Sequence, residues 1–236
     1  MRPAPRAAAD PNPSLQSTYS PSKVVRLLGG WTAVEAEASG LDVAERLGPW
    51  LNAFDAIGLQ AAQQAVRAIQ SPAPGRRSLT PAREAANLAQ DLQRLRQRLA
   101  DAIAQPVDDD GTLAVWQHRQ QKLQRDMEQL IDPLRDHARQ VLARASTGLR
   151  QLAALDAALE QALASRTHKA LPAIGALLDR RYKELRRDGA TAEDPQAWLE
   201  RFRDDWRQAL LAELDLRLEP VAALAAALHE HTRNLE

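Results

Sequence analysis

Cysteine is absent from the 236 residues of the chain, and aromatic residues make up only 4% of them. Without cysteine the chain can form no disulfide, no thiolate metal site and no cysteine nucleophile, a composition that fits a reducing compartment. Long runs of the β-branched and aromatic residues that are typical of strands are also missing. Neither sign of charge is in excess, because 31 basic residues balance 31 acidic ones. The chain therefore has no overall field that attracts nucleic acid or an anionic membrane.

Several functional motifs are lacking as well. No stretch approaches the roughly 20 consecutive apolar residues of a spanning helix. Residues 1–20 contain no apolar segment of the kind found in secretory signals. We therefore expect a cytoplasmic protein that inserts no segment into a membrane and reaches the inner membrane only through a partner. Glycine-rich phosphate loops and serine nucleophile elbows are absent, so the sequence predicts no catalytic residue and no cofactor.

Helix-forming residues dominate the chain from residue 81 onward, and apolar residues recur there at spacings of three and four. This pattern predicts an all-α fold, a bundle of six or seven helices with coiled-coil-like packing. Five prolines in residues 1–21 predict a disordered tail. Residues 22–70 are expected to form an N-terminal helical segment, residues 71–80 a linker, and residues 81–236 the main bundle.

Two regions of the predicted bundle carry its most regular stripes of leucines and aromatic residues. Leucines recur at three and four residues over 149–163, in a helix for which Thr147 is the expected N-cap, and a separate helix is expected over 171–187. The last helix, expected over about 195–231, carries most of the aromatic side chains. Its apolar stripe is either core or a surface for a partner helix, and it consists of Trp198, Phe202, Trp206, Leu210, Leu214 and Leu218.

The densest group of basic residues lies shortly before that helix. It contains Arg180, Arg181, Lys183, Arg186 and Arg187, with Asp179, Glu184 and Asp188 interspersed at salt-bridge spacing. A solvated helix face and a nucleic-acid site are the two interpretations of such a group. A second group, Arg94, Arg96 and Arg98, would strengthen the nucleic-acid interpretation if both groups met on one concave face.

The titratable clusters match no metal site, so we predict none. His229 and His231 flank Glu230, but a zinc-protease motif needs histidines four residues apart on one helix face. Asp108 begins three consecutive aspartates that lack the glutamate a calcium loop requires at its twelfth position. His137 continues an apolar stripe and is expected at a helix interface.

Four segments together resemble a known family: SKVVRLL at 22–28, AERLGPWL at 44–51 continuing into FDAI at 54–57, LRQLAALD at 149–156, and LLAELDLRLEPV at 210–221. This order is similar to a family of uncharacterised proteobacterial proteins classed as a domain of unknown function. Pro49 departs from the family pattern, which has a helix-compatible polar residue there. The family has no established catalytic residues, so the resemblance transfers none.

The resemblance also implies a context. Genes of this family tend to neighbour those of a proton-channel protein similar to flagellar and Tol-type stators and of a peptidoglycan-binding partner. That arrangement is similar to the third type of Zorya anti-phage defence system. It implies a cytosolic accessory component whose partner is a stator-like inner-membrane motor complex or a second cytosolic protein.

Three functions remain open on these grounds. The leading hypothesis is a non-enzymatic helical interaction protein whose partners are other proteins. The alternative is a nucleic-acid-binding effector that uses the arginine-rich helix faces, which the balanced charge does not favour. The third is a hydrolase whose carboxylates converge in one pocket of the bundle.

Overall fold

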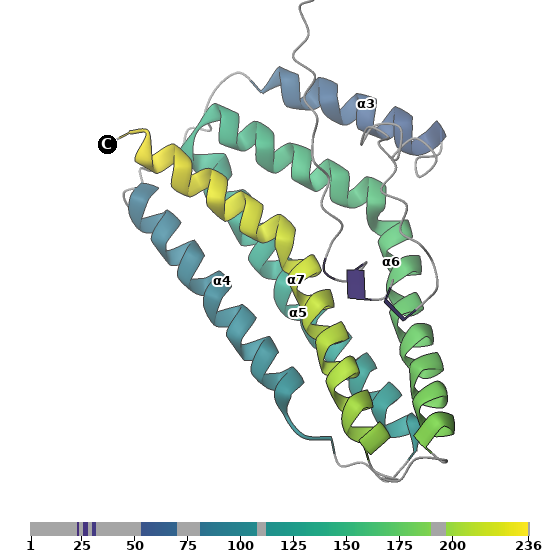
Figure 1. Ribbon diagram of the computed structural model, residues 1–236. Coiled ribbons are helices and arrows are strands. Elements are labelled where there is room, and N and C mark those ends of the chain that lie inside the picture. Colours follow the sequence, from purple (N-terminus) through teal and green to yellow (C-terminus); the bar gives the residue numbers. More distant parts are fainter. Residues whose placement is uncertain are drawn as a thin grey trace, which may run out of the picture.

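The computed structural model (Figure 1) describes residues 53–69, 81–107, 112–189 and 197–235, together with Lys23, Arg26, Leu27, Gly30 and Trp31. Helices dominate these residues, and no strand occurs among them, which confirms the predicted all-α fold. The long helices are α3 (Ala53–Ala68), α4 (Pro81–Ala104), α5 (Leu113–Ala145), α6 (Thr147–Gly189) and α7 (Ala197–Arg233). The predicted tail, the predicted linker at 71–80 and the aspartates at 108–110 lie outside the described residues.

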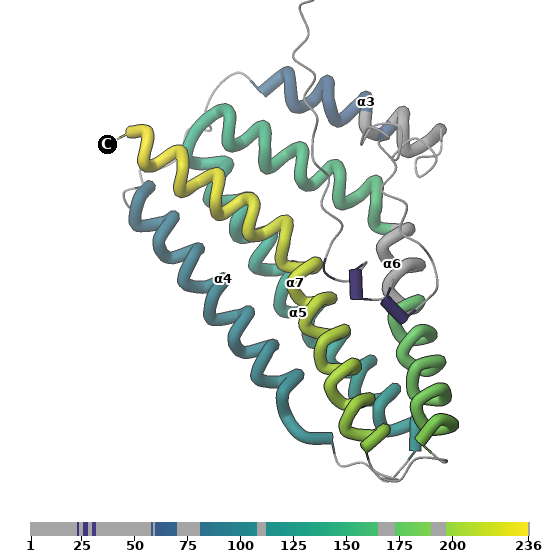
Figure 2. The backbone as a smooth tube through the Cα atoms, viewed as in Figure 1, coloured from purple at the N-terminus to yellow at the C-terminus, as the bar shows by residue number. Residues whose placement is uncertain are grey.

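The helices α4 to α7 form a bundle in which consecutive helices run in opposite directions (Figures 1 and 2). Each of these four helices packs against its two neighbours around the ring, and α5 also contacts α7 across the middle. Helix α7 therefore contacts all three of the others. Helix α3 stands outside this bundle and packs against α6.

One prediction about helix boundaries is wrong. The two helices expected over 149–163 and 171–187 form the single 43-residue helix α6. Pro172 lies inside it, and since a proline removes only one backbone donor, packing on both sides can carry a helix through it. The residue before the helix is Ser146, whose Oγ accepts a hydrogen bond from the backbone N of Leu149 at 3.2 Å. Ser146, rather than Thr147, is thus the N-cap.

The core is centred on α7. Phe202, Trp206, Leu210, Leu214 and Leu218 are all at most 4% exposed, and Trp198 is half-buried against the same core. The ring of Trp116 on α5 meets those of Phe202 and Trp206 edge to face, with ring centroids 5.2 Å apart in both pairs. Edge-to-face contacts of this kind add to the stabilisation from apolar burial. The stripe along α7 is therefore part of the core of the single chain.

Candidate interaction surfaces

An ionic network joins α5 to the first half of α6. Arg135 donates to both carboxylate oxygens of Asp156, at 2.6 and 2.9 Å, and also to Glu160 at 2.8 Å. Arg139 donates from Nε to Asp156 at 2.8 Å, and its Nη2 lies 2.8 Å from Glu160. The side chains of the two arginines and Asp156 are at most 16% exposed. Hydrogen bonds among these charged groups therefore replace much of their contact with water.

This network sets the protonation of its central carboxylate. Burial disfavours the charged form of Asp156, but hydrogen bonds from Arg135 and Arg139 outweigh burial and hold its pKa below the ordinary value. An ionised carboxylate that accepts from two guanidinium groups has no proton to donate. Asp156 is therefore a structural anion and is not suited to act as a general acid at neutral pH.

Asp132, on α5 one turn before the network, has the opposite shift. Burial raises its pKa, and the negative charges of Glu160 and Glu128 raise it further. The carboxylates of this region thus do approach one another, as the hydrolase hypothesis requires. Asp156 and Glu160 are nevertheless paired with arginines of α5. No group of three or more His, Asp or Glu in the described part of the chain could hold a metal ion.

A buried polar contact also crosses the core. Glu213 on α7 is 0% exposed, and its carboxylate accepts hydrogen bonds from Gln124 on α5, at 2.9 and 3.2 Å, and from Arg217 at 2.9 Å. Sequence reasoning missed this contact because Glu213, between Ala212 and Leu214, is one of many charged residues in this helix. A glutamate followed four residues later by an arginine was the available signal.

The first half of α6 presents an apolar surface to solvent. Leu155 and Leu159, one turn apart, are 40% and 38% exposed, although leucines at this spacing were expected to pack against other helices. Between 151 and 164 the only charged residues are Asp156 and Glu160, and the network with α5 engages both. Between residues 151 and 164, therefore, no unpaired charged side chain accompanies the two leucines.

Helix α3 extends this surface. The Nε2 of Gln151 on α6 donates to the carbonyl of Ile69, directly after α3, at 3.0 Å. Helix α3 contains only one acidic and one basic residue among its 16, and none of its described side chains belongs to the buried core. We call the exposed surface formed by α3 and residues 151–164 the α3–α6 face.

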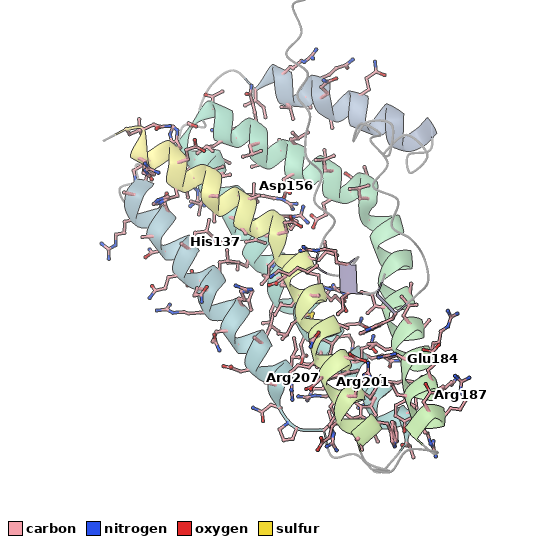
Figure 3. All side chains as sticks on the ribbon, in the orientation of Figure 1. His137, Asp156, Glu184, Arg187, Arg201 and Arg207 are labelled. Carbon is pink, nitrogen blue, oxygen red and sulfur yellow. The ribbon has the colours of Figure 1, made fainter. Side chains whose placement is uncertain are left out.

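The basic group of α6 is divided between two sides of the helix. Arg181 turns inward and donates to Asp205 on α7 at 2.8 Å, and Asp179 accepts from Gln117 on α5 at 2.7 Å. Arg180, Lys183 and Arg187 point outward as one exposed row at spacings of three and four, with Arg186 at its edge. Figure 3 shows Arg187 at the end of α6 that is remote from Asp156.

The second arginine group does not join this row. Arg96 bonds to Asp215 on α7 at 2.7 Å, and Arg94 lies 3.5 Å from Asp91 on its own helix. Helices α4 and α6 stand on opposite sides of the bundle, with α7 and α5 between them (Figure 1). The arginine groups of α4 and α6 therefore do not form the single concave face that would support the nucleic-acid hypothesis.

The histidines are dispersed. His137 is exposed (Figure 3), so its expected place at a helix interface is wrong. Its neighbour Ala138 is the buried residue, because it lies seven positions after Ile131 and so two turns further along the buried stripe of α5. Near the end of α7, His229 and Glu230 are exposed and His231 is half-buried. None of the helices described here has the length and apolar character needed to cross a membrane.

The comparison with protein families gives one match. The model of a family described as "Protein of unknown function (DUF3348)" matches residues 12–230, which is most of the chain. A search of curated proteins and a search of solved structures found no match.

Proposed function

We propose that this chain, which belongs to the DUF3348 family, is a non-enzymatic helical interaction protein that binds another protein through the α3–α6 face. The observation that carries the proposal is the exposure of Leu155 and Leu159 at successive turns of α6. A helix of a soluble bundle ordinarily turns such leucines inward and its charges outward. Here Asp156 and Glu160 turn toward arginines of α5 and the leucines face solvent.

The composition of the face supports a protein partner. Interface centres are depleted in charged residues and consist of apolar side chains that lose their hydration on binding. The α3–α6 face has this character within a chain whose charged residues amount to 26% overall. Exposed apolar patches bordered by polar residues commonly mark interaction sites.

The family resemblance supplies the proposed partner. On that basis the chain is an accessory cytosolic component of a proton-driven, stator-like membrane motor that acts in anti-phage defence. The partner is then the motor complex or a second cytosolic protein of the same system. The α3–α6 face is the surface we assign to that contact.

The test is affinity purification from the native host with three tagged forms of the full chain. The first is the parent and the second carries Leu155→Glu and Leu159→Glu. The third carries Leu216→Glu and is the matched control, because Leu216 is exposed to 38% on α7, away from the face. We expect a motor or cytosolic component in the parent and control samples and its loss from the double variant, whose melting temperature stays near that of the parent. Equal recovery by all three forms would reject the face.

A second function is favoured by one observation, the exposed row of Arg180, Lys183 and Arg187. No ion pair joins Arg180 or Lys183 to another described residue, which leaves their charges available to phosphates. Fluorescence anisotropy with labelled DNA and RNA at two salt concentrations tests this alternative. Binding that weakens on adding salt, and is lost in Arg180→Glu with Lys183→Glu, would support it.

A further inference from the structure

A short segment near the start of the described residues lies against the bundle. Lys23, Arg26 and Leu27 are helical, and Gly30 and Trp31 form a turn after them. Lys23, Leu27 and Trp31 follow one another at intervals of four, so they lie along one side of the segment. All three contact the bundle, on α4, α7 and α6, and we call Lys23, Arg26, Leu27, Gly30 and Trp31 together the strap.

The first contact is ionic. The Nζ of Lys23 lies 2.7 Å from one carboxylate oxygen of Asp215 on α7, and Nη2 of Arg96 on α4 lies 2.7 Å from the other. Burial of Asp215 opposes its charged form, but hydrogen bonds from Lys23 and Arg96 hold its pKa below the ordinary value. Asp215 is thus an ionised acceptor that fits a cation arriving from outside the bundle.

The other contacts are apolar and aromatic. Leu27 and Trp31 are half-buried and pack against the hydrophobic core. The guanidinium carbon of Arg181 lies 5.9 Å from the centroid of a Trp31 ring, within cation–π range. Arg181 is held in place by its hydrogen bond to Asp205. The bundle therefore offers three positions in a row: a carboxylate, an apolar surface and a guanidinium.

A groove continues beside the strap, between α4 and α7. Lys23 and Leu27 form part of its edge, and Asp215 lies within it. Its remaining walls combine amides with apolar side chains, chiefly Gln93, Gln97, Ala100, Gln208, Leu211 and Ala212. The groove therefore borders about two turns of each helix, and the strap forms one of its edges.

We propose that the α4–α7 groove is a binding site for a basic amphipathic segment of a partner protein, and that the strap occupies it as an intramolecular competitor. The chemistry of the strap defines the partner: a lysine or arginine for Asp215, an apolar residue four positions later, and an aromatic residue four positions after that. This site lies on α4, α7 and, at Arg181, the second half of α6, so it is separate from the α3–α6 face, which uses residues 151–164 of α6.

The strap is held weakly enough to exchange. The Lys23 side chain is 63% exposed, and ion pairs with so exposed a partner contribute little to stability. Neither Leu27 nor Trp31 is fully buried. The advantage of the strap is its attachment to the chain, which gives an effective concentration on the order of millimolar. While the strap occupies the groove, it lowers the apparent affinity of the groove for a free segment. Weakening the strap should therefore raise that apparent affinity by the same factor.

A labelled synthetic peptide of residues 20–35 is the probe, and the full chain is the receptor. We expect the peptide to bind the Lys23→Glu, Leu27→Ala double variant at least ~10-fold more tightly than it binds the parent. Adding Asp215→Asn to the double variant should weaken binding several-fold and reduce its salt dependence. Asp136→Asn is the matched control, because Asp136 is 65% exposed on α5, a helix that lines no part of this groove, and it should change nothing.

A second measurement keeps the proposal testable if the double variant folds poorly. Since the chain has no cysteine, Arg26→Cys can carry a single spin label on the strap. Unlabelled peptide in excess should increase the mobility of this label in an otherwise native chain. Equal affinity of the parent and the double variant, no binding to either, or an unchanged label at saturating peptide would each overturn the proposal.

Discussion

The indole of Trp206 fills the space between α7 and α5, where it meets Trp116 edge to face and is 2% exposed. Replacing it with alanine leaves a large cavity among groups that cannot fully close it. We therefore expect Trp206→Ala to lower the free energy of unfolding by about 3–5 kcal/mol, as large aromatic truncations do. Urea denaturation of the variant beside the parent measures the change.

Trp198→Ala is the matched control for that prediction. Trp198 belongs to the same stripe but is only half-buried, and its contact is with Tyr182 at 5.3 Å. We expect a smaller loss of stability from Trp198→Ala than from Trp206→Ala. If the two losses were equal, or if Trp206→Ala had no effect, α7 would not pack as described.

The network around Asp156 predicts a dependence of stability on pH. Its pKa is below the ordinary value of 3.8 in the folded chain, so the unfolded chain binds the proton first as the pH falls. The stabilisation from Asp156 is therefore complete above about pH 4 and is lost as the pH falls through the lower folded pKa. We expect Asp156→Asn to lower the free energy of unfolding at pH 7 by about 1–3 kcal/mol, the range for hydrogen bonds to charged groups. Below about pH 3 the difference from the parent should shrink.

Asp132→Asn provides the comparison, because burial and the charges of Glu160 and Glu128 raise the pKa of Asp132. Removing its negative charge relieves repulsion, so at pH 7 the variant should be as stable as the parent or slightly more stable. Urea titrations of both variants at several pH values separate the two behaviours. A loss from Asp132→Asn as large as that from Asp156→Asn would contradict the assignment of their opposite shifts.

At the scale of elements, the sequence predicted α7 well and α6 poorly. Apolar spacing located the stripe of α7 because its leucines and aromatic residues face the core together. In α6 the same spacing selected Leu155 and Leu159, which are exposed, while Asp156 and Glu160 face α5. Spacing identifies a face of a helix but not what that face packs against. The arginines that bind Asp156, and so turn this side of α6 toward α5, lie 21 and 17 residues earlier in the chain.

Long separations hid other parts of the candidate sites. Lys23 and Asp215 are 192 residues apart, and Gln124 and Glu213 are 89 apart. Neither pair has a local signature, because exposed helices contain many glutamines, lysines and carboxylates. The resemblance of 22–28 to a family motif marked the strap as notable but gave no site for it. Only the folded arrangement of α4, α7 and the strap shows the groove.

The stability of α3 should depend largely on its own helix propensity, since its main packing partner is α6 and none of its described side chains is buried in the core. Gly58 lies inside α3, and a Cβ added there would meet nothing within 4 Å. We expect Gly58→Ala to stabilise α3 by about 0.5–1 kcal/mol, the difference between glycine and alanine in a helix interior. Native-state hydrogen exchange of the α3 amides measures this change directly.

Gly189→Ala is the contrasting substitution for that experiment. A Cβ at Gly189 would lie 2.5 Å from Cδ1 of Trp198, so the indole would have to move. We expect Gly189→Ala to destabilise the protein, although it makes the same change of glycine to alanine, here at the end of α6. Faster hydrogen exchange of the α3 amides in Gly58→Ala than in the parent would contradict the expectation that helix propensity limits the stability of α3.

At the scale of the whole molecule, α4 to α7 contain every fully buried apolar residue of the described chain. A chain that begins at residue 81 should therefore fold by itself into a helical bundle, as the predicted boundary at 80 and 81 implies. We expect a helical circular dichroism spectrum and one cooperative thermal transition. The melting temperature should fall by only a few degrees, because Leu27 and Trp31 of the strap are lost.

The full-length chain melted under the same conditions is the reference for that truncation. A broad, non-cooperative transition after truncation would mean that α3 or the strap belongs to the folding unit. Such a result would also argue against an exchangeable strap, since a removable competitor cannot be essential to the core.

The contacts of α7 with α4, α5 and α6 have a consequence for the nascent chain on the ribosome. The helix that completes the core is translated after the three helices that it contacts, and at about 5–20 residues per second its 37 residues take roughly 2–7 s to synthesise. Throughout that interval the apolar sides of three finished helices have no cover. Chaperones that bind exposed apolar helices therefore have access to these three helices until α7 has been made, and a stop codon inside α7 would make that access permanent.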